Sequence, residues 1–215
     1  FLILTLCCLS HKTRWFRYWN EPAAVFSYRN PLEVAMSLKK REKNFTLERG
    51  LRLWIVYNMN AIQNSQALCV VHTSSDAILA DPLNEIQRIS DELTTTCGVP
   101  PPPSRISQED VDKFIDPKLQ HNRKEREEEE KEVLETYNNG SCVVHSYISD
   151  LEESTAEYKR EHEMYRKAMK IFCDFQSIKR ITNGQNLLET KRVMMPIATI
   201  FSTLFYVSFE DFTFI

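Results

Sequence analysis

The stretch AAVFSYRNPLEVAMSL, residues 23–38, decides the fold. Its first part, Ala23–Tyr28, is a short apolar run of the kind that forms a buried strand, and this strand should end at Arg29. Asn30 can then cap a helix, and Pro31 suits the first helical position. The stretch therefore predicts a strand that is followed at once by a helix.

The helix that starts at Pro31 should run to about Glu42, with Glu33 in the position that completes a capping box. Helical periodicity places Ser37 on the same side as Glu33 and Lys40. The face with the serine is therefore polar, and the opposite side is apolar.

Further helices and strands follow along the chain. Thr46 can cap a second helix that reaches about Ser65, and Leu68–His72 is a second short apolar run that predicts a buried strand. Asp81-Pro82 should start a third helix. Strands that alternate with helices predict an α/β fold with a parallel sheet. A stiff polyproline segment and a short helix after Ser107 follow.

The character of the chain changes after Lys118. Asn122–Glu135 is almost wholly charged and predicts a solvent-exposed helix or a disordered arm. A long helix should open at Asp150, with Glu153 in the capping-box position. Its apolar stripe is expected at Tyr165, Ala168, Phe172 and Phe175. The predicted division is an α/β domain over 1–123, a charged helical extension over 124–180, and an apolar tail over 181–215.

Composition limits the function. The chain has 215 residues, with 27 Lys+Arg against 30 Asp+Glu and a net charge of −3, which excludes a generally basic nucleic-acid binder. The chain has only four glycines, and no two of them are close enough to form a glycine-rich phosphate loop. An all-β fold with many tight turns would need more glycines, so helices are expected to dominate. The apolar run Phe1–Leu9 is too short to span a membrane and is expected to be a buried strand. The length of Val193–Phe209 is near the lower limit for a membrane-spanning helix. A buried apolar tail is therefore favoured, with a membrane tail anchor as the alternative.

The six cysteines show neither a CxxC pair nor zinc-ligand spacing with histidine, so no metal is expected. They are interpreted as thiols in a reducing compartment. This favours the cytoplasm, with the Golgi lumen or a membrane as alternatives. Two N-x-[ST] sequons, Asn44-Phe45-Thr46 and Asn139-Gly140-Ser141, matter only if the chain is secreted.

A local anion site is predicted where the first strand ends. Ligands in open α/β sheets bind outside the carboxyl ends of the strands, and a helix N-terminus favours an anion there. Arg29 can grip a phosphate with two donors, and Ser37 lies about two turns into the helix. The alternative is ordinary capping by Asn30-Pro31 and a serine without a binding role.

The run YRNPLEVAMSL, residues 28–38, resembles the motif that binds the 3′-phosphate in sulfotransferases that use 3′-phosphoadenosine 5′-phosphosulfate (PAPS). In that family an arginine ends a strand and a serine follows eight residues later. Three further segments are similar to bacterial-type sulfotransferases in the same order, namely Leu53–Asn58 (LWIVYN), Ala80–Pro82 (ADP) and Phe114–Arg123 (FIDPKLQHNR). The resemblance covers about Leu4–Arg123.

The resemblance implies a three-layer parallel sheet with flanking helices, related to the P-loop kinases and followed by a helical C-terminal extension. It also implies that Arg29 and Ser37 hold the 3′-phosphate of the co-substrate PAPS, or of its product 3′,5′-adenosine bisphosphate (PAP). The sulfuryl group would move in line to a hydroxyl or amine acceptor. The family's loop for the 5′-phosphosulfate has no counterpart here and would precede Phe1, so the chain is expected to be a fragment that can lack activity.

Other polar and aromatic residues are given a structural interpretation first. His11, the only histidine before the motif, is expected at the surface, so no catalytic base is assigned. Trp54 and Tyr57 are expected in the core, with a substrate-facing role as the alternative. His72 is an outside candidate for the site because it ends a strand. Arg123 either approaches the nucleotide with His121 or begins the charged helix.

Two other functions remain open. The first is a non-catalytic protein that binds a partner through the charged helices 122–175, which could pair as a coiled coil. The second is an adaptor tethered to a membrane by Val193–Phe209. The sequence does not identify the acceptor of a sulfuryl group.

Overall fold

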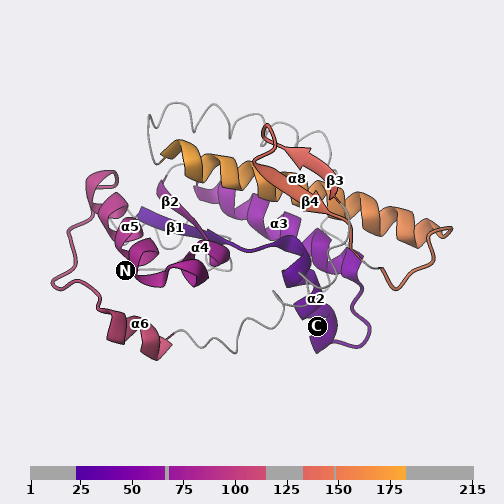
Figure 1. Cartoon of the computed structure of the whole chain (residues 1–215), viewed down its shortest axis with the longest axis horizontal. Coiled ribbons are helices and arrows are strands. Elements are labelled where there is room, and N and C mark those ends of the chain that lie inside the picture. Colours follow the sequence, from indigo (N-terminus) through magenta and orange to yellow (C-terminus); the bar gives the residue numbers. More distant parts are fainter. Residues whose placement is uncertain (1–22, 66–67, 115–132, 148, 183–215) are drawn as a thin grey trace.

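The computed structural model describes residues 23–65, 68–114, 133–147 and 149–182 (Figure 1). This part of the chain contains six helices and two sheets, each of two strands. The mixed α/β class is therefore confirmed. The predicted three-layer parallel sheet is not shown, because the described residues contribute only two parallel strands.

The parallel pair consists of β1 (Ala23–Tyr28) and β2 (Cys69–Ser74), with Tyr28 opposite Ser74. The chain crosses from β1 to β2 through α2 (Pro31–Arg41) and α3 (Leu47–Ser65). Both strands and both helices were predicted, although β2 begins one residue later and ends two residues later than expected. This β-α-α-β unit fixes the position of the predicted anion site.

The start of α2 follows the sequence prediction. The Leu32 backbone N–H donates to Asn30 Oδ1 over 2.9 Å, which satisfies one of the amides that an α-helix leaves unpaired at its start. Pro31 occupies the first turn and brings no N–H of its own. The helix ends at Arg41, with three basic residues in the last turn, where cations favour the helix dipole.

Helix α3 begins after Thr46, whose Oγ1 accepts the Arg49 N–H over 3.2 Å, and its buried residues include Leu51 and Trp54. Helices α2 and α3 approach closely at Gly50. A Cβ placed there would lie 2.7 Å from the Ala35 Cα, inside van der Waals contact. Only glycine allows this approach of the two helices.

The chain after β2 forms three helices on the side of the molecule away from α3: α4 (Ser75–Ala80), α5 (Pro82–Thr95) and α6 (Gln108–Phe114) (Figure 1). Asp81 caps α5 as predicted, with its side chain accepting from the Asn84 N–H. Among the apolar residues of α5, Leu93 is buried, whereas Leu83, Ile86 and Ile89 are half-buried.

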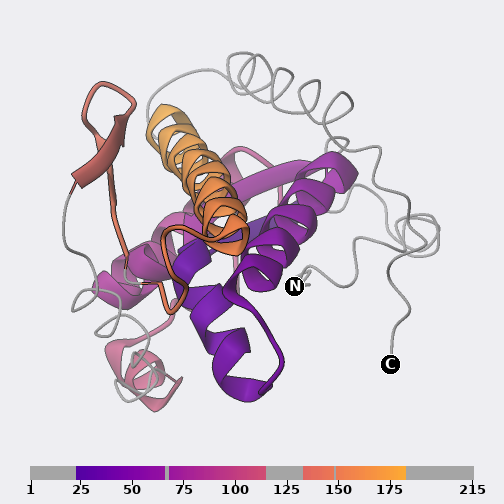
Figure 2. The same ribbon diagram turned by 90° about the vertical axis from the view of Figure 1, so that its right-hand side faces the viewer.

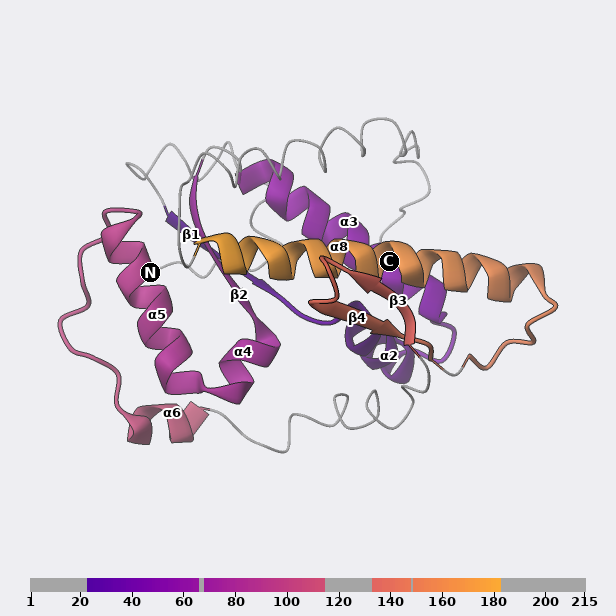
Figure 3. The same ribbon diagram turned by 45° about the horizontal axis from the view of Figure 1, so that its top comes forward.

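The second sheet corrects the prediction for the charged segment. Residues 133–135, expected in a helix or a disordered arm, lie in β3 (Val133–Tyr137), which pairs antiparallel with β4 (Cys142–His145). Residues 122–132 lie outside the described part of the chain. The hairpin stands beside α8 in the views of Figure 2 and Figure 3.

The long C-terminal helix α8 (Ala156–Thr182) starts later than predicted. Thr155, rather than Asp150, supplies the cap, because its Oγ1 accepts the Tyr158 N–H over 3.1 Å. The apolar stripe at Tyr165, Ala168, Phe172 and Phe175 is confirmed, and all four are buried.

Helix α8 shares its core with the parallel strands. The Phe175 ring meets Phe26 at a centroid distance of 5.4 Å, and the Phe172 ring meets Tyr28 at 5.8 Å. Helix α8 runs beside α3 in Figure 1 and Figure 3. The predicted extension thus supplies core side chains to the α/β unit, and the predicted boundary at 123–124 lies outside the described residues.

The prediction of free thiols is wrong for four cysteines. Cys69 and Cys97 form a disulfide that links the start of β2 to the chain after α5, and Cys142 and Cys173 form another that links β4 to α8. The Cα–Cα separations of 5.5 and 5.7 Å are ordinary for disulfides. Pairings of this kind cannot be read from sequence spacing alone.

The described helices include none that is long and apolar enough to cross a membrane. The two apolar segments of interest, Phe1–Leu9 and Val193–Phe209, lie outside the described residues, and so does the rest of the predicted tail 181–215 after Thr182.

Candidate functional site

The candidate site lies at the carboxyl edge of the β1–β2 pair. Because Tyr28 and Ser74 are partners in a parallel ladder, Arg29 and Ser75 leave the sheet at the same edge. Helix α2 begins beside Arg29, and α4 begins at Ser75. This is the edge at which parallel α/β sheets hold their ligands.

Arg29 is fixed at both its backbone and its side chain. Its carbonyl accepts the Trp54 Nε1–H over 2.9 Å, which ties the end of β1 to α3. Its guanidinium Nε donates to Glu33 Oε2 over 2.7 Å. The Arg29 side chain is 33% exposed and that of Glu33 only 2%, so the carboxylate is inside and the guanidinium reaches outward.

The geometry leaves part of this guanidinium available. In the described residues, the Nε–Glu33 contact is its only recorded hydrogen bond, and neither Nη1 nor Nη2 has a recorded partner. A phosphate oxygen pair is gripped by two parallel N–H donors of an arginine. The two Nη nitrogens can supply such a pair while Nε stays on Glu33.

Ser37 lies half-buried in α2, one turn beyond Glu33. Residues four apart on a helix are neighbours on its surface, so Glu33 lies between Arg29 and Ser37. The structure records no direct hydrogen bond between the arginine and the serine in its described part. The ion pair thus places the Arg29 side chain beside Glu33 at the start of α2, and Ser37 lies one turn further along the same face, so that the carboxylate stands between the two predicted residues.

The helix amides contribute less than the sequence predicted. Asn30 occupies the Leu32 N–H, and Pro31 has no N–H to offer. The first turn of α2 thus offers an anion fewer free N–H groups than most helices do, and an anion here would depend mainly on side chains. The Glu33 carboxylate would oppose that anion, because a like charge within a few ångströms is unfavourable.

The other strand contributes small polar side chains. Ser74 Oγ caps α4 by accepting the Ala77 N–H over 3.1 Å, and the Thr73 hydroxyl donates to Glu85 Oε1 over 2.6 Å. Ser75 Oγ is buried and has no hydrogen-bond partner among the described residues. Sequence reasoning did not single out Ser75, although the polar run after β2 was a signal for a strand end facing a crevice.

Arg88 of α5, although close to this edge, is already engaged. Its Nη2 donates to the His72 carbonyl over 2.8 Å and to Glu85 over 2.9 Å, and Nη1 pairs with Glu92. The hydrogen bond that the guanidinium donates to Glu85 is the largest cause that raises the pKa of Arg88. Arg88 therefore acts as a structural clamp between α5 and β2.

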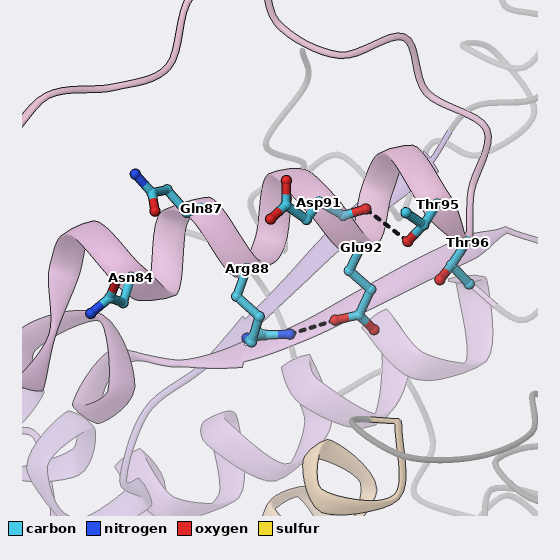
Figure 4. Close-up of a pocket in the computed structure, with 7 residues that line it drawn as sticks. All are labelled: Asn84, Gln87, Arg88, Asp91, Glu92, Thr95 and Thr96. Atoms are coloured by element: carbon cyan, nitrogen blue, oxygen red, sulfur yellow. Dashed lines mark hydrogen bonds and ion pairs between the residues drawn. The ribbon is translucent and has the colours of Figure 1, made fainter.

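An open groove of about 470 Å³ runs along α5, lined by the residues drawn in Figure 4. Its lining includes Arg88, Asp91 and Glu92, and Figure 4 shows Arg88 turned toward Glu92. The groove contains neither Arg29 nor Ser37, so it is separate from the predicted site.

His72 is a core residue. The residue is 5% exposed, and its ring meets the Phe26 ring edge-on at a centroid distance of 5.5 Å. Burial, followed by the nearby Arg88 charge, lowers the pKa of His72 to about 4, so the imidazole is neutral near pH 7. The alternative of a site histidine finds no support in this placement.

The remaining predicted residues divide into two groups. Trp54 is buried as expected, whereas Tyr57 is 42% exposed and does not belong to the core. His11, His121 and Arg123 lie outside the described residues. Within the described ranges, His, Cys, Asp and Glu form no group of three that could hold a metal ion.

Comparisons with known proteins add no relative. No protein-family model, curated protein or solved structure matches this chain significantly. A functional interpretation therefore rests on the residues of the chain itself.

Proposed function

We propose that the β1–α2 junction binds the 3′-phosphate of PAPS or PAP, and that the chain is a sulfotransferase-like protein. In this proposal a sulfuryl group moves from PAPS to a hydroxyl or amine acceptor. The two parallel strands would be part of a larger three-layer sheet. Arg29 and Ser37 would hold the nucleotide, and the catalytic base is unassigned.

One observation carries the proposal: the Arg29 guanidinium is oriented at the carboxyl end of β1 with its two Nη nitrogens available. The Glu33 carboxylate holds Nε, and Trp54 holds the Arg29 carbonyl. A side chain that is held in place before binding loses less conformational entropy when it grips a ligand. The fork of donors then suits a terminal phosphate.

The Glu33 carboxylate sets the expected strength of this site. It stabilises the orientation of Arg29 but also neutralises much of its positive charge, so the bare site should bind an anion weakly. Ser37 can add one neutral hydrogen bond, which is worth about 1 kcal/mol. A doubly charged phosphate would need a second positive group in addition to Arg29.

The partner-binding alternative receives less support from α8. Coiled-coil pairing would need its apolar stripe, but Tyr165, Phe172 and Phe175 are buried in the core of this chain. The charged residues 122–132 lie outside the described part of the chain.

The experiment is retention of the full chain on immobilised PAP, with Kd measured by calorimetry. Arg29→Ala should lose one charge-assisted phosphate contact, which is worth about 1.5–3 kcal/mol. This corresponds to about a 10- to 150-fold rise in Kd. Ser37→Ala should raise Kd about fivefold.

Two further variants separate the site from a general charge effect. Arg166→Ala removes another half-exposed, ion-paired arginine, this one from α8, and should leave the affinity unchanged. Glu33→Gln keeps the shape of the side chain and removes its charge, so it should strengthen the binding of PAP. If wild type does not bind PAP, or if Arg29→Ala binds as wild type does, the proposed site is wrong.

A further inference from the structure

The sequence contains two N-x-[ST] sequons, at Asn44 and Asn139. The structure shows whether each asparagine is accessible for glycosylation. N-glycosylation needs a compartment that holds the glycosylation machinery and an asparagine whose glycan can project into solvent. The structure bears on both requirements.

The first sequon forms the connection between α2 and α3. Asn44 is exposed in a turn and Thr46 is exposed at the start of α3, whereas Phe45 between them is buried. The Phe45 N–H donates to the Glu42 carbonyl over 3.0 Å, and the Arg49 guanidinium lies over the Phe45 ring at 5.0 Å. The middle residue thus anchors the turn and leaves the Asn44 amide facing solvent.

The second sequon forms the tip of the β3–β4 hairpin. Asn138, Asn139 and Gly140 have φ angles of 54°, 57° and 83°, and the Ser141 N–H donates to the Asn138 carbonyl over 3.2 Å. Asparagine tolerates this left-handed region better than most residues. The Asn138 side chain turns back and donates to the Cys173 carbonyl over 2.9 Å, whereas Asn139 is exposed. Both asparagines are exposed, but the side chain of Asn138 is held by this hydrogen bond, whereas no hydrogen bond to the side chain of Asn139 is present among the described residues.

The disulfides supply the second, independent observation. Cys69–Cys97 and Cys142–Cys173 are formed in the structure, and Cys69 and Cys97 are only half-buried. A half-buried disulfide is open to reductants, and such bonds persist in oxidising compartments rather than in the cytosol. The lumen of the secretory pathway is oxidising and also contains the machinery for N-glycosylation.

We propose that Asn44 and Asn139 carry N-linked glycans, attached in the oxidising lumen in which both disulfides form. This proposal does not depend on the PAP site. The folded chain can carry both glycans, because one projects from the turn between α2 and α3 and the other from the tip of the hairpin.

The two modifications are N-glycosylation and disulfide formation. The Asn Nδ2 attacks the anomeric carbon of an oligosaccharide linked to a polyprenyl diphosphate, the new C–N bond replaces the C–O bond, and the diphosphate leaves with the electron pair. The amide loses one proton. Each pair of cysteine thiols loses two protons and two electrons to the disulfide of a thiol-exchange oxidase, which is reduced to a dithiol.

The primary test uses the endogenous protein, captured with an antibody raised against residues 156–175 and quenched with a maleimide before lysis. Peptide-N-glycosidase should increase its mobility and convert Asn44 and Asn139 to Asp, which mass spectrometry of the peptides detects. Cys69, Cys97, Cys142 and Cys173 should resist the maleimide until a reductant is added. An unmodified Asn at either sequon, or maleimide on these four cysteines, would overturn the proposal.

Variants of the full chain, directed to the lumen of cultured cells by a cleavable signal sequence, assign each glycan to its site. Asn44→Gln and Asn139→Gln should each remove one glycosidase-sensitive mobility step, and the double variant should remove both. Asn60→Gln is the matched control, because Asn60 is exposed on α3 and belongs to no sequon. Two steps that persist in the double variant would contradict the assignment.

Discussion

The close approach of α2 and α3 makes Gly50→Ala the sharpest test of the packing around the candidate site. The added Cβ would lie 2.7 Å from the Ala35 Cα and 2.8 Å from its Cβ. Ala35 is completely buried, and the nearest atom belongs to its backbone, so no flexible side chain can move aside. Overpacking of this kind costs about 1–3 kcal/mol, and the backbone contact favours the upper end.

An opposing effect has to be subtracted. Alanine is a better helix former than glycine by up to about 1 kcal/mol, which stabilises α3. The net loss in the free energy of unfolding is therefore about 2 kcal/mol, or a fall of about 4–8 °C in Tm for a chain of this size. Since α2 carries Ser37 and starts beside Arg29, we expect the affinity for PAP to fall as well.

The assay is urea denaturation and thermal unfolding followed by circular dichroism. Asn60→Ala provides the matched control, because this exposed position of α3 gains helix propensity and meets no neighbour that is forced to move. We expect this control to be slightly stabilising. A Gly50→Ala protein as stable as wild type would refute the close packing of α2 on α3.

Two further predictions concern His72 and the second disulfide. The pKa of His72 is lowered from 6.5 to about 4 in the folded chain, so the unfolded state takes up a proton first as the pH falls. The free energy of unfolding should therefore drop by up to about 3 kcal/mol between pH 6.5 and pH 4. His72→Leu should flatten this dependence in urea titrations at a series of pH values, and equal slopes for both proteins would contradict the burial of a neutral imidazole. Replacing Cys142 and Cys173 together by serine opens a loop with a sequence separation of 31, which should cost about 3–4 kcal/mol in the free energy of unfolding. The same denaturation midpoint in the oxidised wild type and in this double variant would argue against the pairing.

Local signals in the sequence predicted the first half of the fold well. β1, α2 and α3 follow from an apolar run, the Asn30-Pro31 cap and a helical stripe that begins after Thr46, and each of these signals acts within a few residues. Asp81-Pro82 located α5 in the same way. Where neighbours along the chain decide the conformation, the prediction is confirmed.

The second half depended on tertiary contacts. Val133–Tyr137 becomes a strand because it pairs with Cys142–His145 and lies beside α8, although the segment before it is dominated by charge. The Asn-Asn-Gly sequence at 138–140 was a turn signal that sequence reasoning passed over. The disulfides likewise depend on which cysteines the fold brings together, and this cannot be derived from their spacing.

In the candidate site, too, the features set by local sequence were predicted and those set by side-chain contacts were not. Placing Arg29 at a strand end and Ser37 on the following helix needed only local rules, and the structure puts both residues there. The Arg29–Glu33 ion pair was not predicted, because a glutamate in the first turn was interpreted as part of a capping box.

The packing of Phe175 on Phe26 has a consequence for biosynthesis. As the nascent chain leaves the ribosome, the aromatic face of β1 has no cover until α8 has also emerged, because Phe172 and Phe175 come from near the other end of the described chain. Contacts between residues so distant in sequence form late and slowly, and exposed apolar strands aggregate meanwhile. Folding of the newly made chain should therefore depend on a chaperone that shields the first strand. A chain that stops before α8 should be insoluble.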